Sequence, residues 1–223
     1  MSNAKQAHLV FVGMGAHARV LLDFLQTNYE IAGAIDHGMQ SGEKVLGISI
    51  YDEIDMPIRF PPTEFLLVNA VGMGSDKRSR KKVSKKMRAL GYKFLTAIHP
   101  TAIVSKQVRV AEGVQIMAGV ILQPGVDIGQ DSIVNTGAKL DHDCRIGEDC
   151  HICPGTIIAG SVGVGAGSFI GAGVIVTPGI RIGDETVIGA GSVIFQDVPD
   201  FSKVIQRRAE IPQRVKEGMG KEK

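Results

Sequence analysis

The densest group of reactive side chains lies in residues 139–156, KLDHDCRIGEDCHICPGT, which hold two histidines, three cysteines and several acids. Such residues can bind a metal ion, carry out thiol chemistry, or move a proton through a histidine that a carboxylate orients. His142 lies between Asp141 and Asp143, so a carboxylate can hold its ring and favour one tautomer. The alternative is a solvated histidine without a role.

A second group, VGMGAHA at residues 12–18, follows an apolar run and precedes a helical pattern. Gly13 and Gly15 would let the backbone approach a phosphate at the start of that helix, and Asp36 ends the next apolar run, where it can accept from a ribose hydroxyl. Two alternatives stay open at this point. One is a tight turn that binds nothing, and the other is a dinucleotide oxidoreductase, although roughly 90 residues supply only one mononucleotide-binding half.

The sequence around these groups follows two different patterns, one before residue 98 and one after it. Residues 8–98 alternate short apolar runs with helical stretches, which indicates βαβ units around a small parallel sheet. We therefore predict a Rossmann-like α/β domain over residues 5–96. Met1 to Ala4 resemble the remnant of an expression tag, and residues 199–223 are expected to form a C-terminal tail.

Residues 97–198 divide into seventeen consecutive hexads, and the second position of every hexad is Ile, Val or Leu. A helix would show period 3.6 and a flat strand period 2, so a strict six demands a short strand, a turn and another short strand. This pattern predicts an all-β parallel solenoid. Three hexads per coil would give a triangular prism whose coils stack about 4.8 Å apart.

The hexad positions of the histidines and cysteines also bear on whether residues 139–156 bind a metal ion or carry out thiol chemistry. Cys144 and Cys150 occupy the sixth position, which small core residues fill elsewhere, whereas His142 is at position four and His151 at position one. These side chains should not converge tetrahedrally, so we expect no metal site. Cys153, at position three, is expected to be exposed but has no paired base in its hexad, which disfavours a nucleophilic role.

Composition and charge exclude several classes of protein. The formal net charge of the 223 residues is +2, and the odd number of cysteines disfavours a disulfide framework. No apolar run is long enough for a membrane helix, and no secretion signal is visible, so we expect a cytoplasmic protein that does not bind membranes. The basic run at residues 77–88 is read as a solvated helix face, since no aromatic residues interleave as nucleic-acid binding would favour.

The order of these motifs resembles a known family. The hexads resemble those of hexapeptide-repeat acyltransferases, which fold as a left-handed parallel β-helix. Over residues 8–204 the chain more narrowly resembles the bacterial sialic-acid O-acetyltransferases and nucleotide-4-amino-sugar N-acetyltransferases. The segments that carry the resemblance are FVGMGAHARVLLDFL, IAGAID, NAVGMG, IHPTAIVS, NTGAKLDHDCRIGEDCHICPGTIIAG and IGAGSVIFQDVPD.

The resemblance implies an acetyl-CoA-dependent N-acetyltransferase that acts on a nucleotide-linked 4-amino-4,6-dideoxy sugar as a homotrimer. It implies that His142 is the general base, Asp143 its orienting partner, Gly160 the oxyanion donor, and His151 a contact to acetyl-CoA, which Gly160 also touches. Gly160 follows His142 by eighteen residues, one full coil. The stretches that match substrate-binding segments contain Gly13, Gly15, His17, Asp36, Gly72, Arg80 and Asn135, of which Arg80 is expected to reach a diphosphate.

Two further functions stay open. A sialic-acid or other sugar O-acetyltransferase would keep the same fold and the same histidine, and a non-catalytic scaffold would need neither. The chain departs from the resembled family at Met14 and Ala16 in the glycine turn and at Asp143, where many relatives have Glu. It also departs after residue 204, where VIQRRAEIP replaces a Gly-x-Pro-Ala-Lys-like segment.

Overall fold

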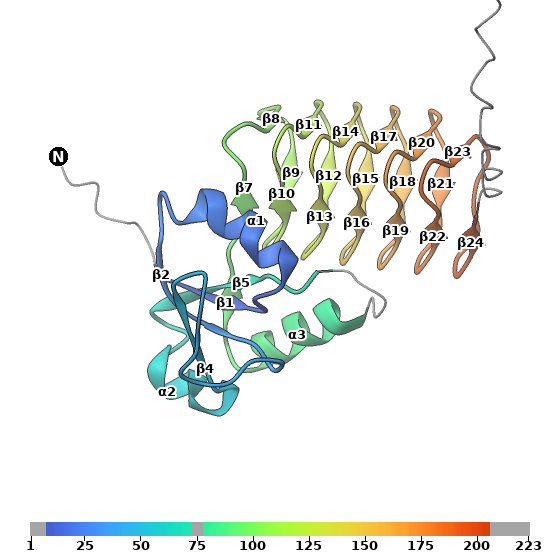
Figure 1. The fold of residues 1–223 in the computed structure, drawn as a ribbon. Helices are drawn as coiled ribbons and strands as arrows, with labels where there is room; N and C mark the ends of the chain where they lie inside the picture. Colours follow the sequence, from blue (N-terminus) through green and yellow to red (C-terminus); the bar gives the residue numbers. More distant parts are fainter. Residues whose placement is uncertain (1–7, 73–77, 206–223) are drawn as a thin grey trace, which may run out of the picture.

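The protein is described by a computed structural model that covers residues 8–72 and 78–205. An N-terminal sheet with helices stands beside the first coils of a three-sided solenoid, which extends away from it (Figure 1). None of the helices in the described ranges combines the length and hydropathy needed to cross a bilayer.

The N-terminal part is a six-stranded sheet in the order β3-β4-β2-β1-β5-β6, with every neighbouring pair parallel except β3 and β4. Its strands are β1 (His8–Val12), β2 (Glu30–Ile35), β3 (Lys44–Val45), β4 (Ile48–Tyr51), β5 (Phe65–Asn69) and β6 (Lys93–Phe94). The helices are α1 (Ala16–Leu25), the 3-10 turn η1 (Glu53–Asp55), α2 (Met56–Arg59) and α3 (Arg78–Ala89). The strand and helix alternation expected from the sequence is present. That this part is Rossmann-like in binding a nucleotide stays a prediction.

The solenoid begins at Ala97, and its first seventeen strands follow the predicted hexads, each strand covering positions one and two. They form three parallel sheets, which we name faces 1, 2 and 3. Face 1 contains β7 (Ala97–Ile98), β10 (Gln115–Ile116), β13 (Ile133–Val134), β16 (His151–Ile152), β19 (Phe169–Ile170), β22 (Val187–Ile188) and β24 (Lys203–Val204). Face 2 contains β8 (Ile103–Val104), β11 (Ile121–Leu122), β14 (Lys139–Leu140), β17 (Ile157–Ile158), β20 (Ile175–Val176) and β23 (Val193–Ile194). Face 3 contains β9 (Arg109–Val110), β12 (Asp127–Ile128), β15 (Arg145–Ile146), β18 (Gly163–Val164) and β21 (Arg181–Ile182).

Stacking of identical hexad positions holds the solenoid together. From β7 to β20, each strand pairs with the strand eighteen residues further on, as Ile133 does with His151, so position-two side chains form continuous inward ladders. These side chains are buried from Ile116 onward, whereas Ile98 in the first coil is 44% exposed because no coil precedes it. The parallel coils and the hexad repeat fit a left-handed β-helix. The frame ends at Val198, after which β24 begins out of step.

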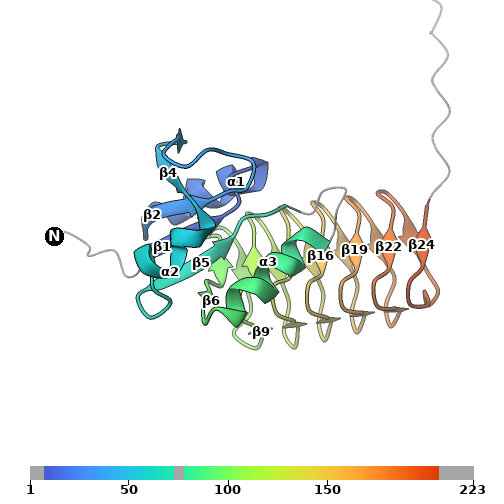
Figure 2. The same cartoon turned by 90° about the horizontal axis from the view of Figure 1, so that it is seen from below.

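The two parts share a core and an ionic contact. Ala97 and Ile133 of face 1, with Met117 directly after β10, pack in the same apolar cluster as α1. On the other side, α3 lies along the corner between faces 3 and 1 (Figure 2). There the Arg88 guanidinium pairs with Asp131 and, at 3.1 Å, with Glu112.

The reading of residues 77–88 as a solvated helix face was therefore incomplete. Lys81 Nζ lies 3.4 Å from an Asp149 carboxylate oxygen on the same corner, and Arg80 is buried. One side of the basic helix docks on an acidic corner of the solenoid because buried or half-buried cations require partners. The contact partners lie 24 to 104 residues away along the chain, beyond the reach of a local pattern.

Candidate active site

His142 lies on the corner between faces 2 and 3, in the turn that follows β14. Its ring Nδ1 is 2.9 Å from Asp143 Oδ2, and its backbone N–H donates to Asp141 Oδ1 at 2.8 Å. Asp143 adopts a left-handed φ of +60°, which directs its carboxylate back to the ring. The hydrogen bond to Asp143 and the charge of Asp141 raise the pKa of His142. A carboxylate at Nδ1 favours the tautomer whose Nε2 carries a free lone pair, as a general base requires.

Gly160 lies against this ring, one coil further along. A Cβ built on Gly160 would stand 2.6 Å from His142 Nε2, so glycine is needed for the ring to occupy its place. The Ser161 N–H donates to the His142 carbonyl at 2.8 Å and fixes the two coils in register. The sequence thus placed His142, Asp143 and Gly160 together correctly. The role of Gly160 as oxyanion donor stays a prediction.

A cleft of about 750 Å³ lies where the N-terminal sheet meets face 1. It lies at the carboxyl ends of β1, β2 and β5, where ligands of parallel α/β sheets commonly bind. Six of the seven residues expected to bind substrate line this cleft, and His151 lines it with them. These six are Gly13, Gly15, His17, Asp36, Gly72 and Asn135.

The glycine turn at the base of the cleft is shaped by close backbone contacts. Gly13 has a φ of +94°, and a Cβ there would meet the Val71 nitrogen at 3.0 Å. Asp36 accepts hydrogen bonds from the Met14 N–H at 2.7 Å and the Gly38 N–H at 2.8 Å. Asp36 therefore holds the turn in shape and at the same time presents a carboxylate to the cleft.

Arg80 does not line the cleft, in contrast to the expected diphosphate contact. Its side chain is buried and donates to the backbone carbonyls of Asn69, Val71 and Asp131. Burial lowers the pKa of Arg80 to about 10. The guanidinium joins the end of β5 to the solenoid, because carbonyls left over where a strand ends need donors when water is excluded.

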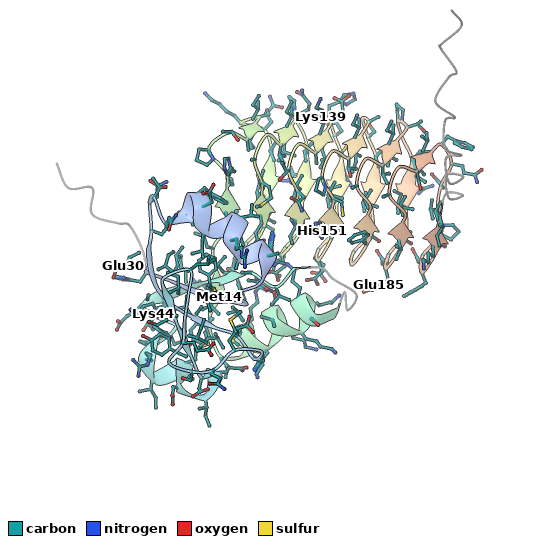
Figure 3. The ribbon with its side chains drawn as sticks, viewed as in Figure 1. Met14, Glu30, Lys44, Lys139, His151 and Glu185 are labelled. Atoms are coloured by element: carbon teal, nitrogen blue, oxygen red, sulfur yellow. The ribbon has the colours of Figure 1, made fainter. Side chains whose placement is uncertain are left out.

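Two histidines face the cleft from opposite sides. His17 Nε2 lies 2.8 Å from Gln115 Oε1, and Asn135 Nδ2 lies 3.1 Å from His151 Nε2. Burial lowers the pKa of both rings, that of His151 to about 4, and the charge of Arg80 lowers both further. Figure 3 shows His151 on the side of the solenoid that faces the N-terminal sheet. The expected contact of His151 with acetyl-CoA stays a prediction.

Sequence reasoning missed Gln115, which is buried and bridges His17 to the Asn69 carbonyl. The available signal was a polar residue at hexad position one of face 1, beside Ala97 and Ile133 in the neighbouring coils. That signal alone does not identify a partner 98 residues away. In the first coil, His99 Nδ1 lies 2.9 Å from Thr101 Oγ1, and the His99 ring stacks edge-on with Phe24.

The three cysteines are buried, and the expectation that Cys153 is exposed was wrong. Cys144 donates to the Ala159 carbonyl and Cys150 to the Gly165 carbonyl, so both act as small core residues. Burial raises the pKa of Cys150 to about 12, which keeps its thiol protonated and inert. Within residues 8–72 and 78–205, no group of three His, Cys, Asp or Glu side chains is arranged to hold a metal ion.

His142 and the cleft lie on different corners of the prism. Asn135 follows β13 on the corner between faces 1 and 2, whereas His142 follows β14 on the corner between faces 2 and 3. Figure 3 shows Lys139, at the start of β14, on the edge of the solenoid away from the N-terminal sheet. Face 2 therefore separates the base from the cleft within one chain.

Comparison with known proteins adds independent observations. Residues 161–196 match the family model described as bacterial transferase hexapeptide (six repeats). No curated protein sequence matches the chain. PerB from Caulobacter crescentus, solved in complex with CoA and GDP-perosamine, is 38% identical, with a TM-score of 0.80 over 89% of this chain and 93% of that one. A mutant of perosamine N-acetyltransferase from the same organism, with the same ligands, has a TM-score of 0.81 at the same identity and coverage.

Two further solved structures are similar over most of the chain. The acetyltransferase domain of PglB from Neisseria gonorrhoeae is 29% identical, with a TM-score of 0.80 over 89% of this chain and 96% of that one; it was also solved with acetyl coenzyme A. WeeI from Acinetobacter baumannii has a TM-score of 0.80 at 19% identity, covers 90% of this chain and 97% of that one, and supports the fold alone. The hexads, the glycine turn, the His142 corner and the full-length similarity agree: the chain belongs to the hexapeptide-repeat sugar N-acetyltransferase family.

Proposed function

We propose that the protein transfers an acetyl group from acetyl-CoA to the amine of a nucleotide-linked 4-amino-4,6-dideoxy sugar. The observation that carries the proposal is His142, whose Nδ1 is held by Asp143 and whose Nε2 is left to take a proton. The cleft lined by the glycine turn and Asp36 would bind the nucleotide sugar. The relative from Caulobacter, crystallised with CoA and GDP-perosamine, supports this pairing of substrates.

The transfer needs no covalent enzyme intermediate. The sugar amine attacks the thioester carbonyl, forming the C–N bond, and His142 Nε2 takes the proton that the amine loses. The Gly160 N–H donates to the oxyanion of the tetrahedral intermediate, which then collapses and breaks the C–S bond. The CoA thiolate leaves and is protonated by the imidazolium, which returns His142 to its neutral form.

The exposed side chains of face 2 suggest how His142 reaches a substrate bound in a cleft on a different corner. Its outward position-one residues are aliphatic at five of six coils, and Ile103, Ile157, Ile175 and Val193 are all more than 40% exposed. The equivalent positions on face 3 are Arg109, Asp127, Arg145, Gly163 and Arg181. An exposed aliphatic ladder on one face of three fits burial against further copies of the chain.

A homotrimer with face 2 turned to its threefold axis would complete the site. In such a ring the two corners that flank face 2 meet between neighbours, so Asn135 of one chain would approach His142 of the next. Both residues belong to one coil, so a threefold axis parallel to the prism keeps them at one height. Each of three equivalent sites would then combine the cleft of one protomer with the base of its partner.

An acetyl-transfer assay with acetyl-CoA and GDP-, UDP- and dTDP-linked 4-amino sugars, CMP-sialic acid and free sialic acid tests the proposal. We expect CoA release and an amide product with at least one amino sugar, and loss of both in His142→Ala. Transfer only to the hydroxyl of a sialic acid would replace the proposal with O-acetylation. Equal turnover in His142→Ala would leave the solenoid as a scaffold.

A further inference from the structure

The cleft holds two histidine rings whose proton positions can be derived from their neighbours. Gln115 Nε2 lies 2.8 Å from the Asn69 carbonyl oxygen, which can only accept, so the amide nitrogen must face it. The amide oxygen of Gln115 therefore faces His17 Nε2, and that nitrogen must carry the proton. Neutral His17 is left with an accepting lone pair on Nδ1.

The same reasoning gives the opposite tautomer for His151. Asn135 Oδ1 accepts from the Thr136 backbone N–H at 2.7 Å, which can only donate, so the amide nitrogen of Asn135 faces His151. His151 Nε2 must then accept, and its proton is on Nδ1. Among the described residues, this buried Nδ1 has no hydrogen-bond partner.

A buried donor without a partner in a cleft calls for an acceptor from a ligand. His151 is 8% exposed, and the phenyl ring of Phe169 packs edge-on against it, which holds the imidazole in place. His17 and His151 line the same cleft. The cleft thus pairs one histidine acceptor with one histidine donor, and a neutral group that both donates and accepts, such as a sugar hydroxyl, can satisfy both.

We propose that His17 and His151 together bind one hydroxyl of the sugar nucleotide, which donates to His17 Nδ1 and accepts from His151 Nδ1. Gln115 and Asn135 are then positioning residues that set the two tautomers. An ammonium group, which only donates, would leave the His151 donor unpaired. The inference rests on the proposed function in that the acceptor sugar nucleotide occupies this cleft.

Long-range ¹H–¹⁵N spectra of the full chain with ¹⁵N-labelled histidine test the tautomers without a ligand, with His17→Phe and His151→Phe used for assignment. We expect His17 protonated at Nε2 and His151 at Nδ1 near pH 7.5. Gln115→Met should release His17 from this tautomer, Gln115→Glu should keep its proton on Nε2, and Gln107→Met, on an exposed turn, should change neither ring. The same tautomer at both rings would overturn the pair.

Calorimetric titrations identify the hydroxyl, with GDP-perosamine and analogues lacking either the ribose 2′-hydroxyl or one pyranose hydroxyl. We expect one analogue to bind wild-type protein about tenfold more weakly than GDP-perosamine does. To the His151→Phe protein, that analogue and GDP-perosamine should bind with equal affinity. Equal binding of every analogue by wild-type protein would refute the hydroxyl contact. If the two rings have opposite tautomers but no acetyl transfer occurs, only the proposed function is refuted. If acetyl transfer occurs but both rings have the same tautomer, only the proposed histidine pair is refuted.

Discussion

The imidazole of His142 occupies the space that a side chain at Gly160 would fill, so that a Cβ at Gly160 would stand 2.6 Å from Nε2. The two residues are eighteen apart, and the solenoid brings them together because that separation is one coil. The position of the proposed base thus depends on the absence of a side chain in the next coil.

Gly160→Ala should therefore displace the His142 ring and lower kcat by about 10²-fold, close to the effect of removing the base. Affinity for the nucleotide sugar should stay near the wild-type value, since the cleft is on another corner. Gly163→Ala is the matched control, because a Cβ there meets only Arg181 Cγ at 3.9 Å. Steady-state kinetics decide the matter, and a Gly160→Ala enzyme with full kcat would show that the ring position is unimportant.

The pH dependence of kcat/KM should report the coupling of His142 to Asp143. A general base works when deprotonated, so activity falls as pH falls through its pKa, and the Asp143 hydrogen bond raises that pKa. Asp143→Asn should lower the pKa and move the acidic limb of the profile to lower pH, together with a lower plateau from the loss of ring orientation. An unchanged limb, measured with the same acceptor, would argue that His142 is not the titrating base.

Ile157→Asp should dissociate the proposed trimer, since Ile157 is 43% exposed on face 2 and its own chain tolerates a polar group there. Light scattering at micromolar concentration should show a monomer mass, and circular dichroism an unchanged fold. Ile54→Asp, at a residue 86% exposed on the N-terminal part, should stay trimeric. A monomeric wild-type protein would remove the basis for a shared site.

The solenoid was predictable because its signal is local and repeated. Position-two aliphatics and small position-six residues gave the strand frame of residues 97–198, and the coil length placed Gly160 beside His142. The hexad count also implies that Asn135 and His142 of the same chain lie on adjacent corners and cannot face one another. That separation follows from the hexads alone.

The junction between the two parts was not predictable, because its contacts join residues distant in sequence. Arg80 suits a phosphate contact by type, but the structure turns it to carbonyls of Asn69 and Asp131. His17 suits substrate binding, yet its tautomer depends on Gln115 in another part of the chain. Such roles are set by which donors and acceptors lose water when the parts pack.

Cys144 and Cys150 should tolerate substitution by residues that fit the stacked sixth hexad positions. Cys150→Ser should keep a donor to the Gly165 carbonyl, as Ser132 and Ser168 do for equivalent carbonyls in the same column, and should barely change the melting temperature. Cys150→Val removes that donor and should cost about 1 kcal/mol of folding free energy. EDTA should leave activity unchanged. Activity lost with EDTA and restored by zinc would contradict the reading of these cysteines as core residues.

In the proposed trimer the cleft of one chain serves His142 of the next chain, and mixed trimers can separate these two parts of one site. His142→Ala removes the base, whereas Gly15→Trp should obstruct the cleft without strain, because Gly15 has a φ of −74° and open space where its side chain would project. Each homotrimer should be inactive. Trimers that contain both chains, purified through two different tags, should retain about one intact site in three, because a closed ring of two types holds one correctly ordered junction. Activity near one third of wild type supports the account, and no activity in the mixed trimers would contradict it by placing the cleft and the base of each site in one chain.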